Sequence, residues 1–132
     1  MKKIMISLMS LGLLVGCTSP KVQMSDEPMT ININIIDEVN EKELFKGSIK
    51  TRYKVLADAL EHKEELKVVM EDGKQGKYIT SMMDVASDGK NFWTYESDNN
   101  DDCLEAAMCK GVSETTLEDG DNFVFIFTDE SK

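Results

Sequence analysis

The sequence of 132 residues contains a single histidine, His62. One imidazole excludes sites that need two or more histidine ligands, including the HExxH zinc hydrolases. The sequence also lacks a GxSxG motif, a Walker loop and a dinucleotide-binding fingerprint, so no motif points to an enzyme class. Basic residues are few, with 15 against 25 acidic residues and a net charge of −10. This charge argues against binding to nucleic acid, and against adhesion to anionic lipid through a basic patch.

The first residues have the pattern of an export signal. Lys2 and Lys3 precede an apolar stretch at residues 4–15, which is too short to span a bilayer comfortably. Leu14-Val15-Gly16-Cys17 resembles the bacterial lipobox, in which the cysteine is lipidated and the chain is cleaved before it. We therefore predict a lipoprotein signal peptide at residues 1–16 and lipidation of Cys17. The alternative is an ordinary signal peptide with a chance cysteine.

The predicted lipid places the chain on the extracytoplasmic face of a membrane, because acyl chains on one cysteine give a durable anchor. Residues 17–28 are polar and contain two prolines, and we predict that they form a flexible tether after the lipidated cysteine. Hydrophobic residues make up 41% of the chain, enough for one packed domain. We expect this domain at residues 29–128, followed by a short tail at 129–132.

Hydrophobic periodicity predicts an α+β domain. Alternation of apolar and polar residues predicts strands, and apolar residues three and four apart predict an amphipathic helix. The last strand is apolar on both faces, so we expect it in the middle of a sheet with a helix packed on it. The order β-β-α-β-β-β predicts a ubiquitin-like β-grasp: a mixed sheet of four to five strands, its first and last strands parallel neighbours, with one main helix on one face. The expected strands are 29–36, 44–50, 78–83, 92–95 and 123–127, and the expected helix is 55–66.

Four blocks of sequence resemble the transcobalamin-like C-terminal domain. They follow the order and about the spacing of that family, and together they cover nearly all of residues 29–128. The resemblance implies a β-grasp fold. The blocks are Val55 to Leu60, Gly76 to Ser81, Phe92 to Tyr95 and Gly111 to Asp121.

The resemblance also implies a binding role. In the cobalamin carriers of animals, this domain covers one face of the corrinoid while a helical domain holds the other face. Bacterial members are often exported lipoproteins, and some are linked to uptake of vitamins or metals by energy-coupling-factor importers. The chain lacks the helical partner domain, so it offers half of such a corrinoid site. The resemblance implies a non-enzymatic lipoprotein that binds a corrinoid-like nutrient or metal complex and presents it to a membrane importer.

Cys103 and Cys109 are the cysteines that remain after Cys17. Exported chains usually oxidise such a pair, and a bridge closing a loop of seven residues would contribute roughly 2 kcal/mol to stability. The alternative is a soft metal site that includes Met108 and nearby acidic side chains. Either outcome needs a turn between the cysteines, because a helical offset of six residues would separate their sulfur atoms.

Trp93 and Tyr95 alternate on one predicted strand and therefore share one face of it. If a helix covers that face, the two rings belong to the core. If the face is open, they form a flat aromatic platform for a planar ligand or a partner protein. Met82, Met83 and Met108 are the other candidate ligand-binding residues, because methionine fills irregular surfaces.

Three functions follow from these observations. The first is the ligand-binding lipoprotein that the resemblance implies. The second is a protein–protein interaction module at the cell surface, because an edge strand of a β-grasp sheet can accept a partner strand. The third is a metal-binding protein that uses the loop of Cys103, Met108 and Cys109.

Overall fold

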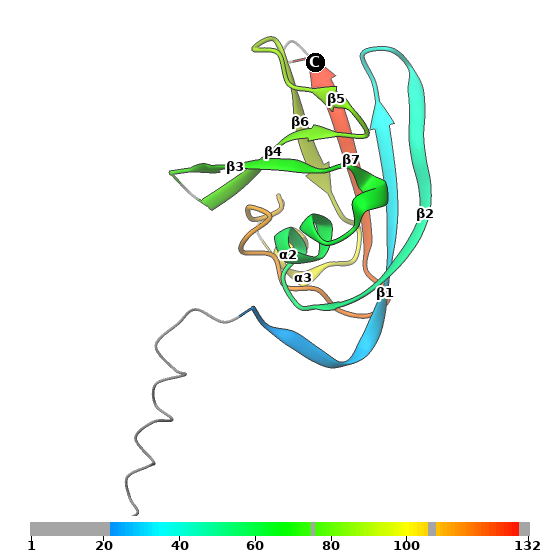
Figure 1. Ribbon diagram of the computed structural model, residues 1–132, viewed down its shortest axis with the longest axis vertical. Helices are drawn as coiled ribbons and strands as arrows, with labels where there is room; N and C mark the ends of the chain where they lie inside the picture. The colour runs from blue at the N-terminus through cyan, green and yellow to red at the C-terminus, as the bar shows by residue number, and fades with distance from the viewer. Residues whose placement is uncertain (1–21, 75, 106–107, 130–132) are drawn as a thin grey trace, which may run out of the picture.

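The computed structural model describes residues 22–74, 76–105 and 108–129 (Figure 1). The predicted signal peptide, Cys17 and residues 18–21 lie outside these residues, as do residues 130–132 of the predicted tail. In the described part of the chain, no helix is long and apolar enough to cross a membrane. The elements are β1 (Met24–Asp37), β2 (Lys42–Tyr53), α2 (Leu56–Glu61), a 3-10 turn (Glu64–Leu66), β3 (Val69–Gly73), β4 (Gly76–Met82), β5 (Val85–Ala86), β6 (Asn91–Glu96), α3 (Asp101–Leu104) and β7 (Asn122–Asp129).

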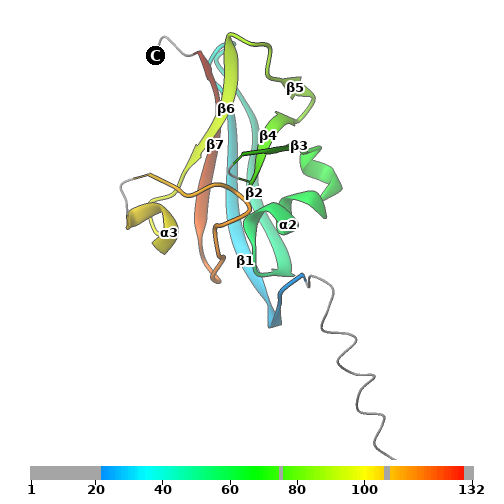
Figure 2. The same ribbon diagram turned by 90° about the vertical axis from the view of Figure 1, so that its left-hand side faces the viewer.

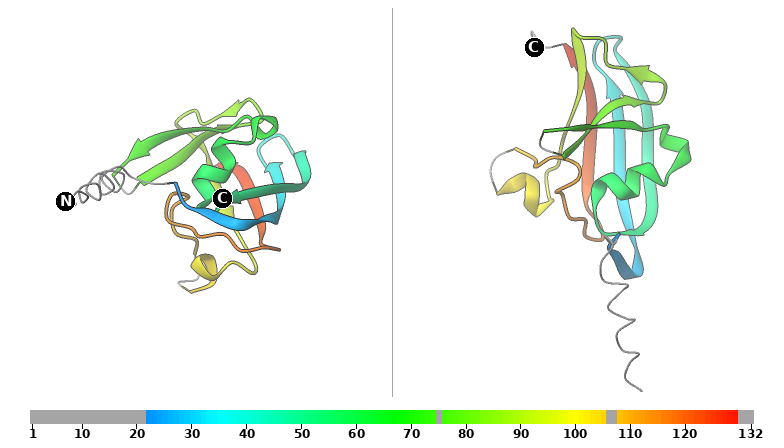
Figure 3. Two further views of the ribbon diagram at one scale, coloured as in Figure 1. Left: turned by 60° about the horizontal axis from the view of Figure 1, so that its bottom comes forward. Right: turned by 60° about the vertical axis from the view of Figure 1, so that its left-hand side comes forward.

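The protein is a mixed α and β structure in which strands predominate and form two sheets. The larger sheet has the order β2-β1-β7-β6, and β1 and β7 run parallel as the sequence predicts. The prediction of a central β7 is also confirmed, because β7 lies between β1 and β6. The smaller sheet has the order β3-β4-β5. Figures 2 and 3 show this smaller sheet and α2 on the same side of the larger sheet.

The core lies between the larger sheet and the elements that cover it. Alternate residues of β1 and β7 point inward and are almost completely buried, as their period of two requires. The covering elements contribute Leu56, Leu60 and Leu66 to the same cluster. The buried strand residues are Ile31, Ile33, Ile35, Phe123, Phe125 and Phe127.

The expected single sheet of four to five strands is wrong in one respect, because β4 belongs to a separate sheet with β3 and β5. No periodicity in the sequence predicts β3 or the two-residue β5. Both are mostly exposed short strands, so they lack the apolar alternation by which strands are recognised. β3 forms by hairpin pairing with β4, from Val69 opposite Ser81 to Gly73 opposite Gly76.

The expected helix at residues 55–66 is interrupted. Helix α2 ends at Glu61, and Lys63 adopts an extended conformation before the 3-10 turn. The turn ends at Lys67, which is left-handed with φ of 49°. Polar residues follow one another from His62 to Glu65, so this segment has one apolar anchor, Leu66, and cannot bury a continuous helical face.

The first strand begins earlier than expected. β1 starts at Met24, so the last five residues of the predicted tether belong to it. Met24 pairs with Tyr53 and Met29 pairs with Thr51, and the residues between them bulge away from β2. The Arg52 guanidinium on β2 donates a hydrogen bond of 3.0 Å from Nε to the Ser25 carbonyl, which links the bulged residues to β2.

Candidate functional site

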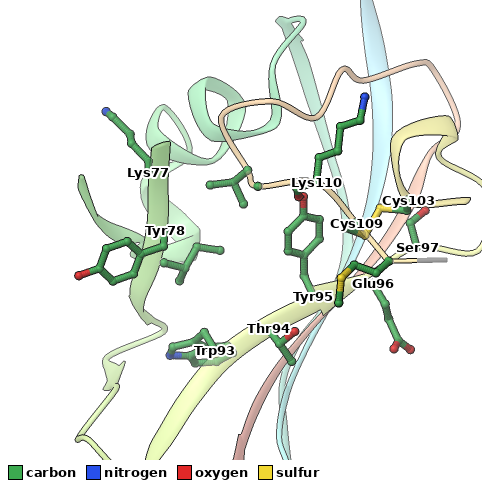
Figure 4. Close-up of a pocket in the computed structure, with 14 residues that line it drawn as sticks. Lys77, Tyr78, Trp93, Thr94, Tyr95, Glu96, Ser97, Cys103, Cys109 and Lys110 are labelled. Carbon is green, nitrogen blue, oxygen red and sulfur yellow. A yellow bond between two sulfur atoms is a disulfide. The ribbon is translucent and has the colours of Figure 1, made fainter. Parts of the chain in front are cut away.

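A cavity of about 420 Å³ lies between β4, the edge of β6 and the segment that follows α3. Strand β6 is an edge strand of the larger sheet. At one end of the cavity, the Trp93 indole donates a 2.8 Å hydrogen bond from Nε1 to the Val85 carbonyl of β5. Below that contact β4 and β6 diverge. Figure 4 shows Tyr78 on β4, Trp93 and Tyr95 on β6, and Lys110 on the loop around this space.

Trp93 forms a fixed wall of the cavity. Its side chain is buried, with 8% exposed, and its ring packs against Phe127 with centroids 5.2 Å apart. Since the indole N–H is already bonded to Val85, this ring offers a ligand an apolar surface rather than a donor.

Tyr95 connects β6 to the loop on the opposite side of the cavity. Its ring stacks on Phe125 at a centroid distance of 5.5 Å. Its hydroxyl donates a short hydrogen bond to the Lys110 carbonyl and also bonds Thr115 Oγ1 at 2.7 Å. Burial, together with the negative charges of Asp102 and Glu114, raises the pKa of Tyr95 to about 12. Tyr95 therefore keeps its proton at neutral pH, and its hydroxyl holds the loop at Lys110 against β6.

The disulfide between Cys103 and Cys109 forms one end of the cavity. Cys103 is buried at the end of α3, and the bridge fixes the chain just before Lys110, whose carbonyl accepts the Tyr95 hydrogen bond. Of the two sequence alternatives for this pair, the structure contains the disulfide. In this structure the two sulfur atoms are bridged and are therefore not thiolate ligands for a metal.

Two lysines border the cavity, and each is paired. Lys110 Nζ lies 3.0 Å from Asp102 Oδ1, which raises the pKa of Lys110. The pKa of Asp102 is lowered, first by the hydrogen bond that it accepts from the Thr116 backbone N–H and then by Lys110. Lys77 Nζ lies 3.5 Å from Glu61. These pairs leave the cavity walls close to neutral.

The chemistry of the walls favours binding. None of the described lining residues is a histidine or a free thiol. Among residues 22–74, 76–105 and 108–129, no three His, Cys, Asp or Glu side chains are grouped so that they could hold a metal ion. What the cavity offers is aromatic wall from Trp93 and Tyr95, which suits an apolar group.

The structure places the candidate residues in two groups. Trp93, Tyr95 and Met108 line the cavity together with both cysteines. The rings do not form the open platform that the sequence allowed, because the smaller sheet and α2 cover their side of the larger sheet. Met82 is fully buried in the core, and Met83 is partly buried against it at a left-handed φ of 51°, so neither lines the cavity.

Sequence reasoning missed Tyr78 and Lys110 as cavity residues. Tyr78 lies in the block Gly76 to Ser81, which carried the fold resemblance but no functional expectation. The residue is 49% exposed and its hydroxyl lies 3.3 Å from Glu71 Oε1 on β3, so Tyr78 lies at the exposed rim of the cavity. Lys110 follows Cys109 directly, and this position is the only feature of the sequence that could have indicated Lys110 as a cavity residue.

The chain matches no family model and no curated protein sequence. It is similar in structure to a candidate metal-binding protein from Ruminococcus gnavus ATCC 29149, with a TM-score of 0.61 and 21% identity over 76% of this chain and 97% of that chain. It is also similar to haptocorrin in a complex with Cbi, with a TM-score of 0.58 and 11% identity over 87% of this chain and 28% of that chain. At these identities the similarity shows a shared fold.

Proposed function

We propose that the chain is a non-enzymatic, exported lipoprotein, anchored through Cys17, whose β-grasp domain binds a small nutrient ligand in the cavity between β4 and β6. The single observation that carries this proposal is the cavity itself, with its aromatic walls and disulfide-fixed end. A cavity of about 420 Å³ is in the size range of small-molecule sites, which are mostly apolar with a few polar groups.

The ligand class is a corrinoid or another planar metal complex. Trp93 and Tyr95 supply aromatic wall to the part of the ligand that enters the cavity, and the disulfide leaves no thiolate that would strip a metal from its complex. The fold shared with haptocorrin, which was solved in a complex with Cbi, supports this choice, and so does the candidate metal-binding protein of Ruminococcus gnavus.

Delivery to a membrane importer completes the proposal. The short tether would hold the domain close to the membrane, where an energy-coupling-factor type importer could take over the ligand. The lipobox Leu14-Val15-Gly16-Cys17 supports the anchor. Labelling of cells with a radioactive fatty acid tests it, because Cys17→Ser should abolish incorporation of the label.

The binding step is tested by calorimetric titration of residues 18–132 with cyanocobalamin and with dicyanocobinamide. We expect saturable one-to-one binding that Trp93→Ala weakens at least about tenfold. Phe92→Ala is the matched control, because Phe92 is the neighbouring aromatic residue of β6, is 42% exposed and does not line the cavity. Flat titrations with both corrinoids would reject the corrinoid as ligand.

A second candidate function is a protein-interaction module, favoured by the free edge of β6. Asp88 N–H donates to the Asn91 carbonyl, so the backbone groups of Asn91 point away from β7. By the alternation of an antiparallel strand, those of Trp93 and Tyr95 point the same way, toward the cavity. Such an edge can accept a partner strand. Protection of these two amides from hydrogen exchange by a protein partner, without any small ligand, would favour this function.

A further inference from the structure

The free edge of β6 brings backbone hydrogen-bonding groups to the cavity, where Figure 4 shows Trp93 and Tyr95. Phe92, Thr94 and Glu96 direct their backbone groups to β7, so those of Trp93 and Tyr95 point to the opposite side. On that side neither residue has a backbone partner among residues 22–74, 76–105 and 108–129. The cavity is therefore bordered by two N–H donors and two C=O acceptors that the described part of the chain does not pair.

These backbone groups have little contact with bulk solvent. Trp93 is 8% exposed and Tyr95 is half-buried. Backbone groups in such surroundings are almost always paired in native proteins, with protein, water or a ligand. The cavity of about 420 Å³ has room for either of the last two. A ligand that supplies an acceptor and a donor together would satisfy both groups of one residue.

A primary carboxamide has the matching arrangement of atoms. In an extended residue the backbone N–H and C=O lie next to each other on one edge of the strand. A primary carboxamide presents its oxygen and one N–H next to each other, so the oxygen accepts from the backbone N–H while the N–H donates to the backbone C=O. A carboxylate or an ester has no proton to donate and would set an oxygen against the backbone carbonyl. The edge therefore favours the carboxamide over both.

The charges around the cavity also favour a neutral group. Lys110 is paired with Asp102, and Lys77 is paired with Glu61. Glu96 adds a negative charge to the lining. A carboxylate entering the cavity would lose its hydration without gaining an unpaired cation, whereas a carboxamide carries no charge to desolvate.

The open edge is short. At one end the Trp93 indole is bonded to Val85 of β5, and at the other end lies the disulfide between Cys103 and Cys109. From Trp93 to Tyr95 the strand advances by about 7 Å, at about 3.3 Å per residue. This length suits a small group at the end of a short arm, and a longer partner strand would have to displace one of the two ends.

We propose that the cavity recognises its ligand through a primary carboxamide, which pairs with the backbone N–H and C=O of Trp93 or Tyr95. The apolar arm that carries the carboxamide contacts the Trp93 ring. This proposal rests on the ligand-binding role proposed for the cavity, and it names the chemical group that the cavity selects. Cobinamide carries primary carboxamides on short arms around its ring, and small free carboxamides carry the same group.

The first probe is 3-phenylpropanamide, titrated into residues 18–132 and followed by backbone amide NMR. We expect saturable shifts of the Trp93 or Tyr95 N–H at about millimolar affinity, as is usual for so small a ligand. The Thr94 N–H, which is directed to β7, is the internal control and should not shift. The matched ligands 3-phenylpropanoate and methyl 3-phenylpropanoate should bind at least about tenfold more weakly.

Hydrogen exchange gives an independent readout of the same pairing. In the free protein the Trp93 and Tyr95 amides should exchange faster than the Thr94 amide, and 3-phenylpropanamide should slow the exchange of at least one of them. Trp93→Ala should weaken binding of this probe, because it removes the ring that contacts the arm. Phe92→Ala is the matched control and should leave the affinity unchanged, since Phe92 does not line the cavity.

A second pair of ligands separates this proposal from the corrinoid function. Dicyanocobinamide should bind at least about tenfold more tightly than dicyanocobyrinic acid heptamethyl ester, in which esters replace the carboxamides. Binding of 3-phenylpropanamide with flat corrinoid titrations would support the carboxamide site and reject the corrinoid. Equal affinity for cobinamide and the ester would support the corrinoid function and overturn the carboxamide site.

Two further results would overturn the proposal. One is the absence of saturable shifts at both Trp93 and Tyr95 with 3-phenylpropanamide up to about 10 mM. The other is equal affinity for 3-phenylpropanamide and 3-phenylpropanoate, which would show that the cavity binds the phenyl ring and does not select the carboxamide.

Discussion

The Tyr95 hydroxyl donates its hydrogen bond to the backbone carbonyl of Lys110, one residue beyond the disulfide at Cys109. A side chain of the edge strand β6 is thereby joined to a loop that the disulfide already holds to α3. The two constraints act on neighbouring residues, so the cavity wall depends on both. The same hydroxyl also bonds Thr115, which is completely buried.

Replacing Tyr95 by phenylalanine should lower the free energy of unfolding by about 1 kcal/mol, because it removes two hydrogen bonds, while the Thr115 hydroxyl keeps its bonds to the carbonyls of Lys110 and Gly111. Urea denaturation measures the change. Tyr78→Phe is the control: its hydroxyl bonds Glu71 at the exposed rim, so we expect a change within about 0.5 kcal/mol. Equal losses in the two variants would show that the Tyr95 hydrogen bonds do not hold the loop.

Stability should fall between about pH 10 and pH 12. The pKa of Tyr95 is raised from 10.0 to about 12 in the folded protein, so in this interval the unfolded chain has lost the tyrosine proton while the folded chain retains it. The unfolded state then binds fewer protons, and stability decreases as pH rises. The contribution is fully present below pH 10 and is lost as pH passes the folded pKa. Urea denaturation at several pH values measures it.

The pKa of Lys110 is also raised, so loss of the Lys110 proton at alkaline pH weakens its ion pair with Asp102 and lowers stability in the same direction. Tyr95→Phe separates the two effects. The variant keeps Lys110, so the difference between the two pH profiles belongs to Tyr95. Absorbance of the ionised phenol gives a second readout, with a component near pH 12 that Tyr95→Phe removes. Absence of this component from the unsubstituted protein would contradict the prediction.

Removing the disulfide with Cys103→Ser and Cys109→Ser should lower the free energy of unfolding by about 2 kcal/mol, as expected for a closed loop of seven residues. The loss should not add to that of Tyr95→Phe, because the bridge and the Tyr95 hydrogen bond fix adjacent residues. A double-mutant cycle by urea denaturation measures the coupling. Strict additivity would mean that the bridge and Tyr95 act on the cavity wall independently.

Asp37→Ala should destabilise the protein by about 1–3 kcal/mol. Asp37 is 2% exposed, and its carboxylate accepts hydrogen bonds from Asn40 N–H at 3.0 Å and Asn40 Nδ2 at 2.8 Å in the turn between β1 and β2. Thermal unfolding measures the effect. Glu43→Ala, on the exposed start of β2, is the control and should change the melting temperature little. A loss as large in Glu43→Ala would assign the effect to the overall charge of the hairpin.

Much of the larger sheet could be predicted from the sequence. The alternation of isoleucine and asparagine at residues 29–36 predicts a strand with one buried face, and Ile31, Ile33 and Ile35 occupy that face. The apolar run at 123–127 predicts a strand in the middle of the sheet, and β7 lies there, although Val124 and Ile126 on its other face are only partly buried. The smaller sheet could not be predicted, since β3 and β5 are held by pairing with β4 rather than by burial of their own side chains.

The candidate site was predictable only in part. Trp93, Tyr95 and the two cysteines are chemically conspicuous in the sequence, and the structure brings them to one cavity. Met82 and Met83 were chosen for their chemistry alone, and their burial depends on how β4 folds over the sheet.

The sequence by itself determined the strand periodicities, the apolar character of β7 and the cysteines available for a bridge. These properties are local, because side chains two residues apart share a strand face whatever surrounds the strand. Tertiary structure alone decided the cavity and the hydrogen bond between the side chains of Asn32 and Asn122. Tyr95 meets Lys110 across 15 residues and Asn32 meets Asn122 across 90, and such contacts arise only when the sheet order and register are set by packing of the whole core.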